Sequence, residues 1–199
     1  MDLNYSTNLI FPVPIHQIDI HGFDEIKDEL IDYAYNLKKE DKGVIISNKG
    51  GWQSNVFAVK ENDDILHSYI SHCISNLPIF KSSVEYEVYA WININKPGAY
   101  NVKHDHPDSN LAGVLWIKCS DNSGNIEFDN PSVFETYREI DSYTDDFKNK
   151  SNIYQSYYFP PIEGRVLVFP SHLLHKVDEN KSREDRISVS FNIRFVNWL

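Results

Sequence analysis

Residues 84–95 read Val-Glu-Tyr-Glu-Val-Tyr-Ala-Trp-Ile-Asn-Ile-Asn, and this stretch decides the fold. Its even positions are Val, Tyr, Val, Ala, Ile and Ile, whereas its odd positions are Glu, Glu, Tyr, Trp, Asn and Asn. Because side chains alternate between the two faces of a strand, this pattern predicts a β-strand with one apolar face. Upstream the hydrophobic period is close to 3.6, so the chain changes from helices to strands near Ser82.

Further strands are expected downstream, most of them separated by turns rich in Gly, Pro, Asn and Asp. They are expected at 111–118, 126–128, 153–159, 165–169 and 186–195. Upstream, apolar residues at helical spacing predict amphipathic helices at 24–39 and 63–77. The stretch 9–13 predicts a short edge strand limited by prolines. The polar, acidic stretch 132–152 is expected to be a long loop that serves as a lid.

This order of elements predicts a mainly β protein with a helical cover, either a β-sandwich or a barrel. No linker or internal repeat divides the chain, so a single domain is expected over 1–199. Within it, 1–80 form a helical N-terminal flank with short strands, and 81–199 form the β core.

The composition narrows the class of protein. The 199 residues carry a formal net charge of −10, which argues against nucleic-acid binding and against a polybasic membrane anchor. The chain shows no signal-peptide pattern and no apolar run of roughly 20 residues. Its two cysteines are too few for a disulfide framework. We therefore expect a soluble, cytoplasmic protein, of which the composition does not indicate the oligomeric state.

Two histidines stand two residues apart at His104 and His106. In an extended strand they share one face, and the intervening Asp105 points to the other. Two imidazoles on one strand form half of a site for iron, zinc, copper or nickel. An exposed polar turn before Pro107 is the alternative interpretation, and the pattern alone does not exclude it.

Two further histidines, His172 and His175, follow the predicted strand at 165–169. Their spacing does not separate a metal ligand from a surface loop residue. Farther on, Arg186 and Ser188 alternate with apolar residues and share a strand face. A guanidinium and a hydroxyl so placed suit a carboxylate, although an ordinary half-exposed strand shows the same pattern.

In this order, the motifs resemble those of the iron(II)- and 2-oxoglutarate-dependent oxygenases. The likeness is greatest to a small branch of 2-oxoglutarate–iron(II) oxygenases common in phages and marine bacteria. It extends over residues 85 to 195 and rests on the stretches 91–93, 97–101, 104–107, 111–116, 128–131, 164–171, His175 and 186–192. The resemblance implies a double-stranded β-helix, the jelly roll also found in cupins, that binds Fe(II), 2-oxoglutarate and dioxygen.

The resemblance also implies roles for single residues. His104 and His175 are the expected metal ligands, and Arg186, assisted by Ser188, is expected to bind the far carboxylate of 2-oxoglutarate. The superfamily commonly has a carboxylate two residues after the first histidine, where this chain has His106. Strand parity favours His106 over Asp105 as the third ligand, unless the strand bulges. Three histidines would leave the site one unit more positive.

The implied reaction is the decarboxylation of 2-oxoglutarate to succinate and CO2, coupled to hydroxylation of a small molecule or a protein side chain. Two alternatives remain: a cupin-like three-histidine metal enzyme without 2-oxoglutarate, and a non-catalytic jelly-roll binding or structural protein of a phage. Trp91, Trp116, Phe128 and Phe169 are candidate pocket walls, or core residues. Asn93, Asn101 and Asn192 could orient bound groups or serve the structure alone.

Overall fold

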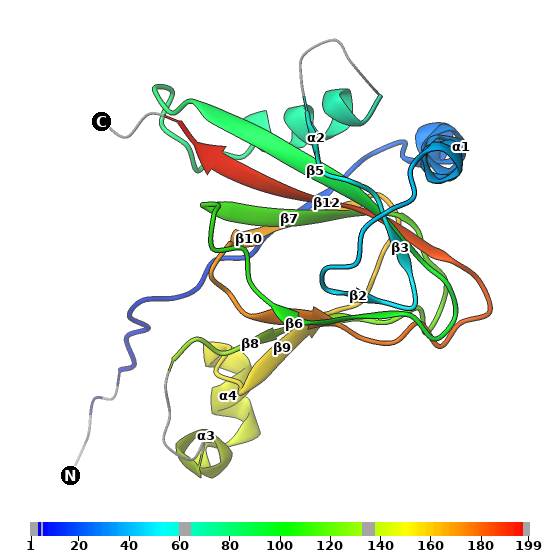
Figure 1. Ribbon diagram of the computed structural model, residues 1–199. Coiled ribbons are helices and arrows are strands. Elements are labelled where there is room, and N and C mark those ends of the chain that lie inside the picture. Colours follow the sequence, from blue (N-terminus) through cyan, green and yellow to red (C-terminus); the bar gives the residue numbers. More distant parts are fainter. Residues whose placement is uncertain (1–3, 5, 60–64, 133–137, 197–199) are drawn as a thin grey trace.

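The computed structural model describes residues 4, 6–59, 65–132 and 138–196, which form two antiparallel sheets facing each other (Figure 1). The major sheet has the order β1 (His16–Asp19), β10 (Arg165–Pro170), β7 (Leu111–Lys118), β12 (Arg186–Phe195), β5 (Tyr86–Asn95) and β3 (Trp52–Gln53), and β4 (Phe57–Ala58) also pairs with β5. The minor sheet has the order β2 (Asn48–Lys49), β6 (Tyr100–His104), β11 (His175–Val177), β8 (Ile126–Asp129) and β9 (Ser156–Phe159). This is the jelly-roll architecture that the sequence predicts.

The alternating stretch forms β5, and its two faces have different environments. Val88, Ala90, Ile92 and Ile94 are buried in an outer core shared with the helices α1 (Asp24–Glu40) and α2 (Ile65–Ser75). Full burial of each valine or isoleucine side chain contributes about 1.5–3 kcal/mol to the free energy of unfolding. The polar face is turned toward the minor sheet, where Trp91 and other residues line an internal pocket. The polar face of β5 is thus part of the interior of the jelly roll from Trp91 onward, whereas Glu87 on the same face is exposed.

Both predicted helices are present. The first was expected at 24–39 and is α1, with acidic residues in its first turn and lysines in its last, as the helix dipole favours. The second was expected at 63–77 and is α2, although residues 63 and 64 lie outside the described part of the chain. Both helices lie over the outer face of the major sheet in Figure 1.

The predicted edge strand at 9–13 is wrong. The first strand is β1, which pairs with β10 and begins at His16. Pro12 and Pro14 have no backbone N–H for a ladder hydrogen bond, which explains why pairing starts only after them. Leu9, Ile10 and Phe11 are exposed instead.

The predicted loop at 132–152 is also wrong in part, because it contains the helices α3 (Arg138–Ser142) and α4 (Asp145–Ser151). The oxygen of Thr144 accepts a hydrogen bond from the backbone N–H of Phe147, and Asn152 ends α4 in the left-handed conformation. No residue of α4 is buried, so hydrophobic periodicity carried no signal for it. Residues 133–137 are outside the described part, and the lid role stays a prediction.

None of the helices in the described ranges is long and apolar enough to span a bilayer.

Gly113 on β7 allows a close approach to the neighbouring strand β12. A Cβ atom there would lie 2.2 Å from the ring of buried Phe191 and 2.8 Å from the carbonyl oxygen of Leu167. We expect Gly113→Ala to lower the free energy of unfolding by about 2–3 kcal/mol, because neither neighbour can easily move. Urea denaturation measures this change. Gly98→Ala is the control, since its Cβ meets nothing within 4 Å although its φ is +85°, and an equal effect of both changes would contradict the packing argument.

Candidate metal centre

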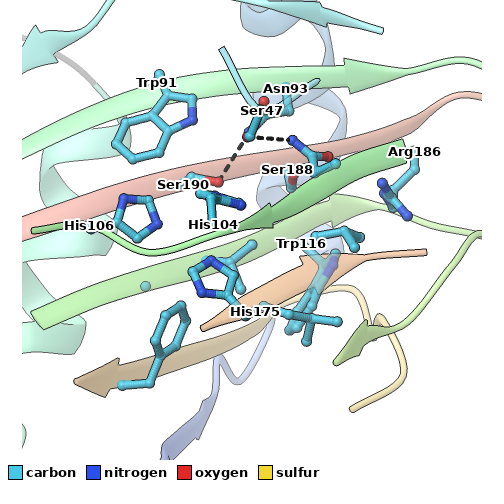
Figure 2. A pocket seen from close by; sticks show the side chains of 16 residues that line it. Ser47, Trp91, Asn93, His104, His106, Trp116, His175, Arg186, Ser188 and Ser190 are labelled. Carbon is cyan, nitrogen blue, oxygen red and sulfur yellow. Dashed lines mark hydrogen bonds between the residues drawn. The ribbon is translucent and has the colours of Figure 1, made fainter. Parts of the chain in front are cut away.

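A pocket lies between the inner faces of the two sheets (Figure 2). Three histidines are at one end of it and Arg186 is at the other. It is lined by Ser47, Trp91, Asn93, Asn101, His104, His106, Gly113, Val114, Trp116, Ile126, Phe169, His175, Val177, Arg186, Ser188 and Ser190.

The three histidines come together through the pairing of two short strands. His104 ends β6 and lies directly across from His175, which begins β11. His106 follows two residues after His104, and its ring centroid is 5.1 Å from that of His104 and 5.2 Å from that of His175. Ring nitrogens of all three lie within 4.8 Å of one another. Three imidazoles gathered in this way can ligate one transition-metal ion.

Backbone carbonyls orient two of these rings. The Nδ1 of His104 lies 2.7 Å from the carbonyl oxygen of Val102, and the Nδ1 of His175 lies 2.8 Å from that of Leu173. Because a carbonyl oxygen can only accept, each Nδ1 carries the proton and donates it. The Nε2 of each ring therefore keeps its lone pair for a metal ion, which is the usual role of such supporting bonds.

Burial keeps these imidazoles neutral. It lowers the pKa of His106 to about 3, an effect that the neighbouring His175 and His104 increase, and it lowers the pKa of His175 to about 4. Burial also lowers the pKa of His104, against the hydrogen bond from its ring to Val102. Neutral imidazole is the form that binds metal ions.

These lowered pKa values predict acid sensitivity of the metal-free protein. The unfolded chain takes up protons on His106 and His175 below pH 6.5, whereas the folded chain takes them up only near pH 3 to 4. Between these limits the unfolded state binds more protons, so stability is retained above pH 6.5 and falls as the pH falls. We expect the free energy of unfolding to drop by roughly 2–4 kcal/mol between pH 7.5 and 5, measured by urea denaturation with a chelator present. His106→Gln should reduce this drop, and an unchanged pH dependence would contradict the explanation.

Asp105 and His172, the two alternative metal ligands considered from the sequence, lie outside the histidine cluster. Asp105 is exposed and lies beyond the end of β6, and its carboxylate is not part of the three-histidine cluster, although its charge acts on His104 and His175. His172 is exposed as well and does not line the pocket. The structure therefore brings together His104, His106 and His175, and it does not bring Asp105 or His172 to them.

Aromatic side chains surround the histidine cluster. The ring of Phe169 lies 4.9 Å from that of His175 in an edge contact, and the ring of Phe128 lies 5.7 Å from it. Trp91 lies 5.7 Å from His106. Phe128 and Phe169 also belong to the buried core between the sheets, so they both pack the core and limit the access of water to the histidines.

Arg186 is a buried cation at the other end of the pocket. Its side chain donates hydrogen bonds through one guanidinium nitrogen to the carbonyl oxygens of Ser123, Gly124 (3.2 Å) and Asp178 (3.3 Å). Arg186 is 2% exposed, and burial lowers its pKa to about 10. Within the described part of the chain it forms no ion pair with a carboxylate. A buried cation that no carboxylate contacts is costly, even with the charge of Asp178 acting on it, so this end of the pocket favours an anionic ligand.

Polar side chains connect the two ends along the major sheet. Ser188 and Ser190 follow Arg186 on the same face of β12, and Ser188 pairs across with Asn93 of β5. The amide nitrogen of Asn93 donates to the Oγ of Ser190 at 3.1 Å, while its amide oxygen is buried without a protein partner.

A second polar group forms a side wall that the sequence did not reveal. The amide nitrogen of Asn95 donates to the amide oxygen of Asn101, and the amide nitrogen of Asn101 donates to the Oγ of Ser47. Ser47 lies beside β2, which pairs with β6, so it reaches the pocket from the N-terminal flank. It was missed because no motif surrounds it and only this long-range pairing brings it to the site. Ser190 stood in a quoted motif, and its alternation with Arg186 and Ser188 was the available signal.

Comparisons with known proteins agree with this geometry. A family described as "Putative 2OG-Fe(II) oxygenase" matches residues 89–192, just over half of the chain. A prolyl-4-hydroxylase from Pseudomonas putida has a similar structure, with a TM-score of 0.64, 13% identity, and coverage of 93% of this chain and 94% of that one. A search of curated proteins by sequence finds no match.

Two further solved structures are similar at low identity. A prolyl hydroxylase from Trichoplax adhaerens, in complex with a hypoxia inducible factor peptide fragment, has a TM-score of 0.59 at 12% identity, and 90% of this chain and 83% of that one are covered. HygX from Streptomyces hygroscopicus, with nickel and 2-oxoglutarate bound, has a TM-score of 0.57 at 9% identity, with 92% and 83% covered. These likenesses support the jelly-roll fold.

Proposed function

The chain belongs to the 2OG-Fe(II) oxygenase family, and from this we propose that His104, His106 and His175 hold the iron and that Arg186 and Ser188 bind 2-oxoglutarate. One observation carries the proposal: a buried guanidinium, which no carboxylate of the described residues contacts, lies across the pocket from a cluster of three neutral imidazoles. 2-Oxoglutarate is a dianion with a carboxylate at each end. It therefore suits a pocket with a metal at one end and Arg186 at the other.

The residues present fit both cofactors. Three imidazoles are suitable ligands for Fe(II), and their two backbone hydrogen bonds leave the Nε2 atoms of His104 and His175 unprotonated. At the other end, three backbone carbonyls fix one nitrogen of Arg186. Within the described chain the other two guanidinium nitrogens donate to no acceptor, which leaves N–H groups for a carboxylate.

The bound iron and 2-oxoglutarate supply the oxidising chemistry, in which dioxygen converts 2-oxoglutarate to succinate and CO2 and a substrate C–H bond is hydroxylated. The protein positions these groups and limits the access of water. Trp91, Phe128 and Phe169 form apolar walls near the histidines. Asn93 and Asn101 border the pocket and are proposed to orient the bound 2-oxoglutarate.

The substrate is proposed to be a small molecule or a protein side chain, the class already expected from the sequence. One similar structure is a prolyl hydroxylase in complex with a peptide fragment, which is compatible with the second option. The cytoplasmic location and the relation to the branch found in phages and marine bacteria remain predictions from the sequence.

The release of succinate tests this function without knowledge of the substrate. We expect purified protein with Fe(II), 2-oxoglutarate, ascorbate and dioxygen to form succinate slowly, and a chelator to stop it. Metal binding without any effect of 2-oxoglutarate would favour the cupin-like alternative. Protein in which His104→Ala and His175→Ala change neither metal content nor thermal stability would favour the non-catalytic alternative.

A further inference from the structure

The pocket is unusual for an acidic protein, because its lining carries no negative charge. The protein has a net charge of −10, yet none of the described residues that line the pocket is Asp or Glu. Arg186 is the one charged side chain among them. The histidines add no charge when they bind a metal ion, since imidazole binds as a neutral ligand.

The acidic residues near the pocket lie outside its lining, although the charge of Asp178 acts on Arg186. Asp129 is paired with Lys103 at 2.5 Å, and Asp178 and Glu127 are both paired with Lys176 at 3.4 and 2.9 Å. Glu163 is likewise paired with Lys27, and the hydroxyl of Tyr35 donates to Asp185. Asp105 is exposed, so solvent weakens its charge, which nevertheless acts on His104 and His175.

A charge remains after both proposed cofactors are in place. Among the groups that line the pocket, the charges of Fe(II) and 2-oxoglutarate cancel, and the charge of Arg186 is left over. With a carboxylate in the place of His106 the same pocket would be neutral. Because the pocket is largely buried between two sheets, an unbalanced charge there attracts an anion more strongly than it would in water.

Free hydrogen-bond donors lie next to the histidines. Trp91 lies beside His106, and its indole N–H donates to no residue that the structure describes. Ser190 accepts a hydrogen bond from Asn93, and its own hydroxyl proton is given no acceptor within the described chain. Figure 2 shows Trp91 and Ser190 on the same side of the pocket as His106 and His104.

We propose that the pocket holds a second anion besides 2-oxoglutarate, a carboxylate group of the substrate, bound near the metal by Trp91 and Ser190 because His106 replaces a negative ligand. This inference rests on the proposed function and specifies its substrate class as carboxylate-bearing molecules. An inorganic halide carries the same charge as a carboxylate. The experiment therefore tests a carboxylate and a halide separately.

The test uses full-length protein loaded without oxygen with Co(II), whose visible spectrum reports changes in coordination, and with saturating 14C-labelled 2-oxoglutarate. Sodium acetate and sodium chloride are titrated separately into a chloride-free buffer, and retention of the label is checked. We expect acetate to bind saturably to the wild type, and His106→Asp to weaken it about tenfold or more. Trp91→Phe removes the indole donor and should weaken acetate severalfold.

Lys103→Gln is the matched control, because it changes the net charge by the same unit as His106→Asp but lies on the exposed side of β6. We expect it to change acetate binding less than about twofold, since solvent screens that position. If His106→Asp no longer binds cobalt, the acetate affinity of Trp91→Phe tests the proposal instead.

Several outcomes would overturn the inference. These are acetate that does not bind the wild type, binding that neither His106→Asp nor Trp91→Phe weakens, and chloride that binds more tightly than acetate. Wild-type protein that fails to bind cobalt or 2-oxoglutarate would instead refute the proposed function. Cobalt and 2-oxoglutarate bound without acetate would refute the second anion alone.

Discussion

Replacing His175 with alanine is expected to lower the affinity for Fe(II) or Co(II) by about 100-fold or more and to abolish the formation of succinate. His175 lies across from His104 in the minor sheet and is 4% exposed. Its loss removes one of the three proposed ligands and leaves a cavity between Phe128 and Phe169. Loss of even a supporting residue outside the ligand set typically lowers metal affinity 10- to 100-fold, so the loss of a ligand should do at least as much.

Metal titration followed by the cobalt spectrum measures this effect, and circular dichroism checks that the variant is folded. His172→Ala is the matched control, because it removes the same side chain three residues away at an exposed position. We expect the control to bind metal as the wild type does. Equal affinities of His175→Ala and the wild type would rule out His175 as a ligand.

The second large effect is expected at Arg186. Arg186→Met should weaken the binding of 2-oxoglutarate by about 100-fold or more while the metal still binds, because truncating one partner of a buried charge pair costs about 2–5 kcal/mol. Methionine fills part of the same volume and leaves no buried charge behind. Without 2-oxoglutarate, the variant is therefore expected to be as stable as the wild type or more so.

Isothermal titration of the cobalt-loaded protein with 2-oxoglutarate measures this change. Arg194→Met is the control, because Arg194 lies on the same strand β12 but is exposed. Arg186→Lys should recover only part of the affinity, since an ammonium group cannot form the paired hydrogen bonds of a guanidinium. Wild-type affinity in Arg186→Met would remove the central support for the 2-oxoglutarate site.

The sequence allowed much of the fold to be predicted, because the two longest strands of the major sheet, β5 and β12, alternate regularly. Strand β5 is the clearest case, with four apolar side chains against the helices and the polar ones inside. The helices α3 and α4 were missed because they are short, and α4 has a side-chain cap and ion pairs but no buried residue. The strands β2, β3 and β4 have two residues each, which is too short for a period to show.

The site could be predicted where its residues stand two apart on a strand, because such residues point to the same face. Arg186 and Ser188, two residues apart on β12, had to share a face, and the same parity was expected of His104 and His106, although β6 ends at His104. The choice between His172 and His175 could not come from parity, because it depends on the point at which β11 begins to pair with β6. Ser47 could not be predicted for the same reason: its place follows from a pairing between segments about 50 residues apart.

The two ends of the pocket belong to different sheets, and this has a consequence for the movements of the whole molecule. The minor sheet supplies His104 and His175, whereas the major sheet supplies Arg186 and Ser188. A molecule that bridges the two ends thus acts as a removable cross-link between the layers of the sandwich. When this molecule dissociates, the two sheets are no longer connected through it. Backbone amides in both sheets should therefore be better protected from hydrogen exchange when the pocket is occupied than when it is empty. The distance between the two sheets should therefore depend on whether 2-oxoglutarate is bound.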